Sequence, residues 1–265
     1  MQIILMSIVA GMVGMGLGGL ITALLGSRTE RMISIFLSFA GGVMSCIVFI
    51  ELIPEAVELA EDYGLNGIVT AIVGLIIGAA LVYGLNHIVD IISSKGKIKA
   101  KLHNTYAEYF HADDIIANKN RMLRSGVIIL VAVGLHNFPE GLAIGAAGVF
   151  DMNLGFTLAV MIGLHCIPEG MAVAAPLISG GLTRGRAVLL AFLIGVPTVV
   201  GAALGMLIGG VSDFAIAVSF SVAGGAMLYV VFGEILPQSI TTSKDRVPTI
   251  FVLLGIVVGM LMTLI

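Results

Sequence analysis

AGGVMSCIVFIELIPEA, residues 40–56, has a counterpart in AGGAMLYVVFGEILPQS, residues 223–239. The two segments share an Ala-Gly-Gly start, a Val-Phe pair, a glutamate (Glu51 and Glu234) and a proline three residues after each glutamate. A chance match between glycine-rich apolar helices would not also align the charged residues and the prolines, so we interpret the pair as an internal repeat. The repeat predicts that the beginning and the end of the chain share one fold.

The composition favours a lipid bilayer as the surroundings of this fold. Of the 265 residues, 58% are hydrophobic and 11% are charged, and the mean hydropathy is +1.12. A soluble domain typically carries about 25% charged residues. The net charge of −3 gives no reason to expect a nucleic-acid partner. Cys46 and Cys166 both lie in apolar segments, so we expect no disulfide framework.

Eight stretches are long and apolar enough to cross a bilayer as helices. We interpret the first as a retained transmembrane helix, because it has neither a basic leading region nor a clear cleavage site of a signal peptide. The sequence therefore predicts an all-α integral membrane protein with eight transmembrane helices. Their approximate ranges are 2–25, 32–57, 67–91, 125–147, 154–179, 185–209, 214–237 and 247–265.

The loops between these stretches alternate in charge. Lysine and arginine concentrate in the odd-numbered loops, and the third loop alone holds seven of the chain's 13 basic residues. The fourth and sixth loops carry Asp151 and Asp213 instead. By the positive-inside rule, the odd loops are cytoplasmic and both termini face outward. We expect a multi-pass protein of the cytoplasmic (inner) membrane, with residues 92–124 in the cytoplasm.

The long third loop leaves two interpretations open. His103, His111, Asp113 and Asp114 could form a cytosolic metal-sensing site, and the alternative is a solvated basic loop without a ligand.

The predicted topology makes the repeat inverted, because residues 40–56 run outward and residues 223–239 run inward. Inverted repeats are typical of alternating-access transporters, which bind their substrate near the bilayer midplane. The predicted organisation is a 3+2+3 arrangement of helices. Residues 1–91 form a three-helix unit, 92–124 a cytoplasmic loop, 125–179 a central helix pair, and 180–265 a second, inverted three-helix unit.

The central pair carries a repeat of its own, GLHNFPEGLA (134–143) and GLHCIPEGMA (163–172). The histidine and glutamate of each copy are four residues apart and therefore share one face of a helix. At a rise of about 1.5 Å per residue, each histidine lies about 16 Å into its span, near the midplane.

These midplane residues predict a metal site. An ionised carboxylate at the centre of a span costs about 2.5–3.5 kcal/mol, and no lysine or arginine lies in the middle of any predicted span to compensate it. A bound cation would serve instead, and imidazole with carboxylate suits zinc, iron(II), manganese or cadmium. The predicted metal-site residues are His136, Asn137, Glu140, His165, Cys166 and Glu169.

The repeated glutamates lie nearer the membrane surfaces. Glu51 is predicted to act at the outer entrance and Glu234 at the inner exit, and Met44 and Ser45 are predicted to line the same pathway. The alternative is that both glutamates are helix-end carboxylates that face headgroups and water.

Three classes of function fit these residues. The first is metal transport by alternating access. The second is an intramembrane zinc hydrolase, in which two histidines and a carboxylate hold the metal and a second carboxylate acts as base. The third is a sensing or structural protein whose bound metal never crosses. Inverted symmetry favours the first class, because it serves access from two sides and offers catalysis no clear advantage.

HNFPEG and HCIPEG resemble the signatures of the Zrt/Irt-like (ZIP) metal transporters, and the resemblance, closest to the short prokaryotic GufA-like branch, covers essentially the whole chain. It implies uptake of divalent metal, chiefly zinc, with iron, manganese and cadmium as further candidates. It implies no enzymatic activity, supports the 3+2+3 arrangement and admits a homodimer. By motif, His136, Glu140, His165 and Glu169 would form the primary site. Asn137, with the two glutamates as bridging carboxylates, would face a second.

Two positions depart from the binuclear members of the family. Cys166 stands where those members carry an acidic residue, and Val196 stands before Pro197 where they carry a glutamate. We therefore expect one strong metal site, with the second weak or absent. Cys166 is expected to shift the preference toward softer ions if its side chain reaches the pore.

Overall fold

The computed structural model describes residues 1–25, 30–95, 115–208, 213–243 and 245–263. No strand occurs in these ranges, which confirms the all-α class. Within them, seven helices are long and apolar enough to cross a membrane, and an eighth, Val247–Met262, is apolar but shorter. The seven are Gln2–Leu25, Arg31–Asp62, Gly67–Ile88, Met122–Val149, Met152–Ser179, Arg184–Leu207 and Phe214–Thr242.

Four of the spans are interrupted, and the two repeated segments are interrupted alike. The second span comprises α3 (Glu30–Ile47), the π-helical turn η2 (Val48–Leu52) and α4 (Ile53–Asp62). The seventh comprises α10 (Asp213–Val230), the π-helical turn η4 (Val231–Ile235) and α11 (Leu236–Thr242). A proline follows each π turn within the first two residues of the next helix, where its missing N–H removes an upstream helical hydrogen bond. Each turn carries the repeated glutamate.

The first and sixth spans also match each other in being broken. The first comprises α1 (Gln2–Ser7), the π-helical turn η1 (Ile8–Val13) and α2 (Gly14–Leu25). The sixth comprises α8 (Arg184–Leu193) and α9 (Val196–Ile208), which are separated by a two-residue turn at Ile194 and Gly195.

The other spans are continuous. They are α5 (Gly67–Lys95), α6 (Ile115–Phe150), α7 (Met152–Ser179) and α12 (Val247–Met262). Because α6 begins at Ile115, the last part of the sequence-assigned loop 92–124 is helical. The candidate loop ligands His103, His111, Asp113 and Asp114 lie outside the described residues.

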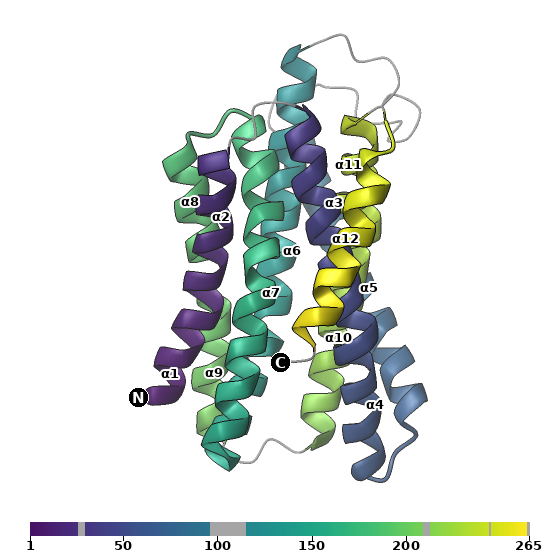
Figure 1. Cartoon of the computed structure of the whole chain (residues 1–265). Helices are drawn as coiled ribbons and strands as arrows, with labels where there is room; N and C mark the ends of the chain where they lie inside the picture. The colour runs from purple at the N-terminus through teal and green to yellow at the C-terminus, as the bar shows by residue number, and fades with distance from the viewer. Residues whose placement is uncertain (26–29, 96–114, 209–212, 244, 264–265) are drawn as a thin grey trace.

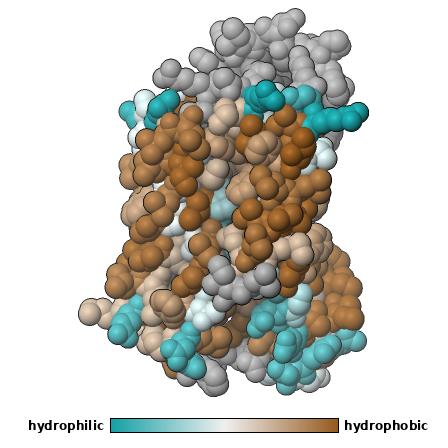
Figure 2. Space-filling view, viewed as in Figure 1, coloured by the Kyte–Doolittle hydropathy of each residue, from teal (hydrophilic) through white to brown (hydrophobic). Residues whose placement is uncertain are grey.

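The two ends of the molecule differ in charge. One end, at the top of Figure 1, gathers the end of α2, the starts of α3, α6 and α8, and α11. The other end holds α4, the turn between α6 and α7, and the start of α10. A hydrophobic band separates two hydrophilic rims (Figure 2), as expected for a multi-pass membrane protein. Arginines of the first end are Arg31, Arg184, Arg186 and Arg246, and acidic residues of the other are Glu58, Glu61, Asp62 and Asp151.

The spans pack as two four-span bundles. We call α1, η1, α2, α6, α7, α8 and α9 the motif bundle, because it carries both histidine motifs. The remaining helices, α3, η2, α4, α5, α10, η4, α11 and α12, form the frame bundle. The most extensive contacts within the bundles are those of α6 with α9, α3 with α12, α5 with α10 and α6 with α7, followed by α2 with α7. The bundles meet mainly along α3–α7 and α6–α10. The first span of each three-helix unit therefore packs with the central pair rather than with its own unit.

Glycines bring the helices of each bundle into backbone contact. A Cβ on Gly170 of α7 would lie 2.1 Å from the carbonyl oxygen of Met15, and one on Gly225 of α10 would lie 2.1 Å from that of Leu75. Among the described glycines, every such approach to another helix joins two helices of the same bundle. Gly14, Gly18, Gly201 and Gly205 all make such close approaches, as small residues do between packed membrane helices. Side chains, rather than glycine-mediated backbone contacts, fill the boundary between the bundles.

Candidate metal centre

The two histidine motifs meet at the boundary of α6 and α7. The Nε2 atom of His136 lies 3.0 Å from Oε1 of Glu169, and Nε2 of His165 lies 3.3 Å from Oε1 of Glu140. All four side chains are buried, with at most 2% of any of them exposed. The pairing is crossed, because the two helices are antiparallel and each histidine faces the glutamate of the other helix. The antiparallel turn is closed by Asp151, whose side chain accepts a hydrogen bond from the backbone N–H of Asn153 at the start of α7.

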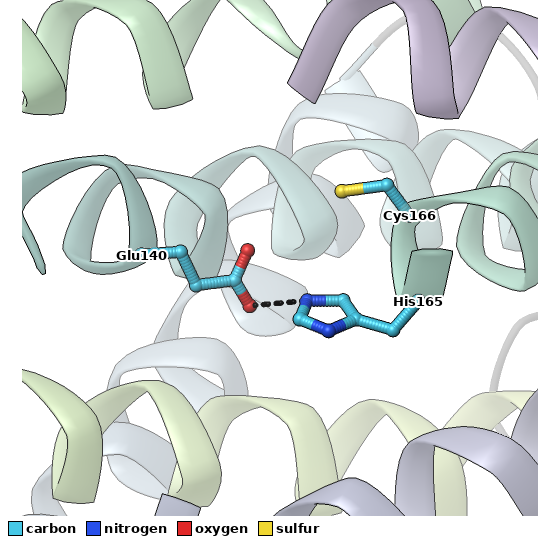
Figure 3. A group of neighbouring side chains, drawn as sticks. All are labelled: Glu140, His165 and Cys166. Carbon is cyan, nitrogen blue, oxygen red and sulfur yellow. Dashed lines mark hydrogen bonds and ion pairs between the residues drawn. The ribbon is translucent and has the colours of Figure 1, made fainter. Parts of the chain in front are cut away.

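The ligand atoms group into two triads that share Glu140. His136, Glu140 and Glu169 form one triad, and Glu140, His165 and Cys166 form the other. In each, one ligand atom per residue lies within 4.8 Å of the others. Figure 3 shows Glu140 on α6 facing His165 and Cys166 on α7. The arrangement places imidazole, carboxylate and thiol donors around one small volume.

Several polar atoms of this volume are buried without a hydrogen-bond partner among the described residues. They include Oε2 of Glu140, Oε2 of Glu169 and Nδ1 of His136. A buried carboxylate oxygen without a partner is unfavourable, because it has lost water and gained nothing in return. A divalent cation would satisfy these atoms, and the donor set is one that such ions bind.

Asn137 is also fully buried but turns toward the break in the sixth span. Its Nδ2 donates a hydrogen bond of 3.1 Å to the carbonyl oxygen of Ile194, which the break between α8 and α9 leaves without a helical donor. The amide thus ties α6 to α8 and α9 beside the metal centre, and its Oδ1 stays without a partner among the described residues.

The predicted outer-pathway residues differ in their surroundings. Glu51 in η2 is half-buried and lies within electrostatic range of His165 and Glu140, so its carboxylate belongs to the same polar region. Met44 and Ser45, on α3, are buried, and the Ser45 hydroxyl donates to the carbonyl of Gly41 at 2.7 Å. The Ser45 hydroxyl is therefore satisfied within its own helix.

Glu234 in η4 is half-buried and has a polar neighbour that the sequence reasoning missed. Asn86 of α5 donates through Nδ2 to Oε1 of Glu234 at 3.1 Å, and the same nitrogen lies 3.4 Å from the hydroxyl of Tyr229. The signal was present in the sequence, since an asparagine near the end of an apolar span needs a partner.

A hydroxyl cluster of Ser34, Ser38 and Ser239 was missed as well. Ser239 of α11 donates to the carbonyl of Ser34 at 2.9 Å, and its hydroxyl is also hydrogen-bonded to those of Ser34 and Ser38 on α3. The equivalent positions of the other repeat are Ala217, Ser221 and Ala56. The two repeats therefore differ. Hydroxyls join α3 to α11, whereas two of the three equivalent residues, on α10 and α4, are alanines.

Comparison with known proteins agrees with this architecture. Residues 111–265 match the family described as ZIP Zinc transporter. The chain is 33% identical to a protein named Zinc transporter ZupT of Akkermansia muciniphila, over 98% of this chain and 94% of that relative. A protein of the same name from Corynebacterium efficiens is 32% identical over 87% of this chain and 85% of the relative, and one from Corynebacterium glutamicum is 32% identical over 92% and 90%. These relatives are transporters, which sets aside the intramembrane hydrolase alternative. The chain belongs to the ZIP family of integral membrane metal transporters.

Proposed function

We propose that this protein carries divalent metal ions, chiefly zinc, into the cytoplasm by alternating access through the centre on α6 and α7. The observation that carries the proposal is the crossed pairing of His136 with Glu169 and of His165 with Glu140. These side chains are buried, and each glutamate has one carboxylate oxygen without a partner in the described part of the chain. The inverted repeat and the family membership support it, as do the names of the relatives.

His136, Glu140, His165 and Glu169 act as the primary ligands in this proposal, with Asn137 and Cys166 beside them. Iron, manganese and cadmium are further candidate substrates, because nitrogen and oxygen ligands accept all of these divalent ions. The homodimer admitted by the resemblance stays a prediction.

The orientation of the protein in the membrane follows from the charge of its two ends, and the direction of transport, into the cytoplasm, follows from the family resemblance. Under the positive-inside rule the end that carries the arginines faces the cytoplasm, and the predicted topology then puts both termini outside. Glu51 then lies between the outer surface and the centre, and Glu234 with Asn86 lies on the cytoplasmic side. An incoming ion passes Glu51, sheds water at the centre and leaves past Glu234. Binding has to be tight enough to replace the water and weak enough to allow release.

The two bundles supply the conformational change. Glycine-mediated contacts join helices within a bundle, whereas α3–α7 and α6–α10 make the boundary between bundles. In the proposed cycle, the motif bundle moves as one body against the frame bundle and carries the ion with it. Residues on the two sides of the centre are then open to water in alternation.

The test is zinc flux into proteoliposomes that contain a fluorescent zinc indicator. Three proteins are compared: the wild type, His136→Ala with Glu140→Ala, and a control with His87→Ala and Glu58→Gln. The control removes the same two residue types from exposed positions on α5 and α4. We expect saturable flux from the wild type and the control, and only background flux from the site variant at equal insertion. Absence of saturable flux from folded wild-type protein at every imposed zinc and pH gradient would overturn the proposed function.

A further inference from the structure

Cys166 belongs to the buried core and also lies among the donors of the metal centre. Its side chain is fully buried, its thiol is free, and its Sγ atom lies within 4.8 Å of ligand atoms of both Glu140 and His165. Figure 3 shows the sulfur and the two other donors around one space between α6 and α7. The inference below rests on the proposed function, because it names the class of ion for which that same centre is built.

The backbone around Cys166 fixes where the sulfur can point. A Cβ on Gly14 of α2 would lie 2.9 Å from the Cβ of Cys166, so α2 packs directly on this residue and only glycine fits opposite it. The corresponding residue on α6 is Asn137, which turns its amide to the carbonyl of Ile194. The Cys166 sulfur lies instead within 4.8 Å of ligand atoms of Glu140 and His165. Two residues at equivalent places in the two motifs thus have different roles, one structural and one facing the donors.

A second observation indicates a ligand at this place. Oε2 of Glu140 and Oε2 of Glu169 are buried without partners among the described residues, and Glu140 belongs to the triad that contains the sulfur. Zinc takes sulfur at about 2.3 Å and nitrogen or oxygen at about 2.0–2.2 Å, so tetrahedral ligand atoms lie about 3.3–3.8 Å apart. A contraction of about 1 Å would bring the three donors of the triad to those separations.

We propose that Cys166 is a metal ligand that determines specificity: with Glu140 and His165 it forms a nitrogen–oxygen–sulfur triad that selects zinc and cadmium over manganese and iron(II). Thiolate is a soft ligand that favours zinc and cadmium, whereas carboxylate and water suit manganese. The ion binds the thiolate, so the thiol proton passes to a water molecule that the ion sheds as the sulfur–metal bond forms. The triad supplies three of the four ligands of a tetrahedral zinc ion, and the fourth position is left to the other primary ligands or to water.

The chain offers a matched control for this residue. Cys46 is the other cysteine, and it is also buried and free, but it lies on α3 of the frame bundle, against Gly259 of α12. The variants Cys166→Ser and Cys166→Asn change the proposed ligand, the second by introducing the residue that α6 carries at the equivalent place. Cys46→Ser removes the same chemical group elsewhere.

The first measurement is competitive uptake of cadmium and manganese into proteoliposomes. We expect both Cys166 variants to lower the ratio of cadmium to manganese uptake at least about tenfold, within the range that loss of supporting metal-site groups produces. Cys46→Ser should keep the wild-type ratio. An unchanged ratio in folded Cys166→Ser would overturn the inference while leaving transport itself intact, whereas a wild type that moves no metal would overturn the proposed function.

The second measurement needs neither transport nor a folded site variant. Cobalt(II) or cadmium bound to a thiolate gives a sulfur-to-metal charge-transfer absorption in the ultraviolet. We expect this absorption when cobalt(II) is added to purified wild type and to Cys46→Ser. If neither protein shows it at saturating cobalt(II), sulfur is not a ligand and the inference is wrong.

Discussion

At the scale of single residues, Glu140 holds a position that its partner in the repeat does not share. It belongs to both triads, whereas Glu169 belongs to one. We expect Glu140→Gln to weaken zinc binding by about 100-fold and Glu169→Gln by about tenfold, the upper and lower ends of the range for metal-site groups. Competition between the purified protein and a soluble zinc indicator measures both. Equal losses, or a larger loss in Glu169→Gln, would contradict the shared role.

The sequence predicted which residues meet at the centre but not how they pair. Spacing alone put His136 with Glu140 on one helix face, since residues four apart are neighbours on a helix. The pairing with Glu169 across the boundary depends on the register of α6 against α7, and the short turn at Asp151 and the packing of both helices on α2 and α9 set that register. The hydrogen bond from Asn137 to the carbonyl of Ile194 could not be predicted from the sequence either, because it requires the break between α8 and α9.

At the scale of elements, the hydroxyl cluster joins α3 to α11. Ser239 makes hydrogen bonds to the hydroxyls of Ser34 and Ser38 and to the carbonyl of Ser34, all buried. Ser239→Ala is expected to lower the free energy of unfolding by about 1–3 kcal/mol, because buried partners lose their hydrogen bonds. Ser219→Ala is the control, since within the described ranges that half-buried hydroxyl donates to the carbonyl of Ala215 in its own helix. Thermal unfolding in detergent compares them, and similar midpoints for the two variants would refute the stabilising role.

The start of α12 depends on pH through Asp245. The Ser243 hydroxyl and the backbone N–H of Val247 donate to its Oδ1 at 2.6 and 3.0 Å, and Arg31 lies 4.0 Å from its Oδ2. These groups, the Ser243 hydrogen bond first, hold the pKa of the Asp245 carboxyl below its usual range.

A carboxyl pKa that is lowered on folding stabilises the protein fully above the unfolded pKa of about 3.9, and this stabilisation disappears as the pH falls through the lower folded pKa. Asp245→Asn should therefore unfold at a lower temperature than the wild type at pH 7. The two midpoints should converge when the pH falls below the folded pKa. A constant difference across the whole pH range would show that the charge of Asp245 is not responsible.

The sequence predicted the spans better than their interruptions. Length and hydropathy are enough to find a helix that crosses a bilayer, and seven of the eight expected spans meet that criterion in the described residues. The prolines after Glu51 and Glu234 predicted a disturbance of each helix. Whether that disturbance is a kink or a π-helical turn such as η2 or η4 depends on the packing around it. Similarly, nothing in the basic segment before residue 125 required α6 to begin at Ile115.

At the scale of the whole molecule, the inverted repeat was predictable and the grouping into bundles was not. Self-similarity defines units along the chain, whereas packing partners depend on which glycines face which helix. Gly201 of α9 illustrates this, because its added Cβ would lie 2.2 Å from the carbonyl oxygen of Phe138 on α6. That contact attaches the sixth span to the central pair rather than to the helices that follow it.

Gly201→Ala should therefore separate α9 from α6 and lower stability by about 1–3 kcal/mol, as overpacking does. Gly84→Ala is the matched control, because an added Cβ at that helical position would have no atom of another described segment within 4 Å. The control should keep or slightly raise stability, since alanine favours a helix over glycine. The midpoint of thermal unfolding, together with the yield of folded protein, distinguishes the two. Equal tolerance of both changes would contradict a close α6–α9 contact.

The proposed transport cycle requires movement of the motif bundle against the frame bundle, and a reversible cross-link tests this movement. Leu135 on α6 and Val222 on α10 belong to different bundles but line one cavity of about 430 Å³, which Leu81 on α5 also lines. Cysteines at 135 and 222 link the bundles through a cleavable thiol reagent, and cysteines at 81 and 222 link two helices of the frame bundle. The native thiols of Cys46 and Cys166 are buried.

Zinc flux measured before linking, after linking and after cleavage gives the answer. We predict that the link between residues 135 and 222 lowers flux to background, that cleavage restores it, and that the link between residues 81 and 222 leaves it unchanged. Full flux through protein whose two bundles are covalently joined would contradict the account.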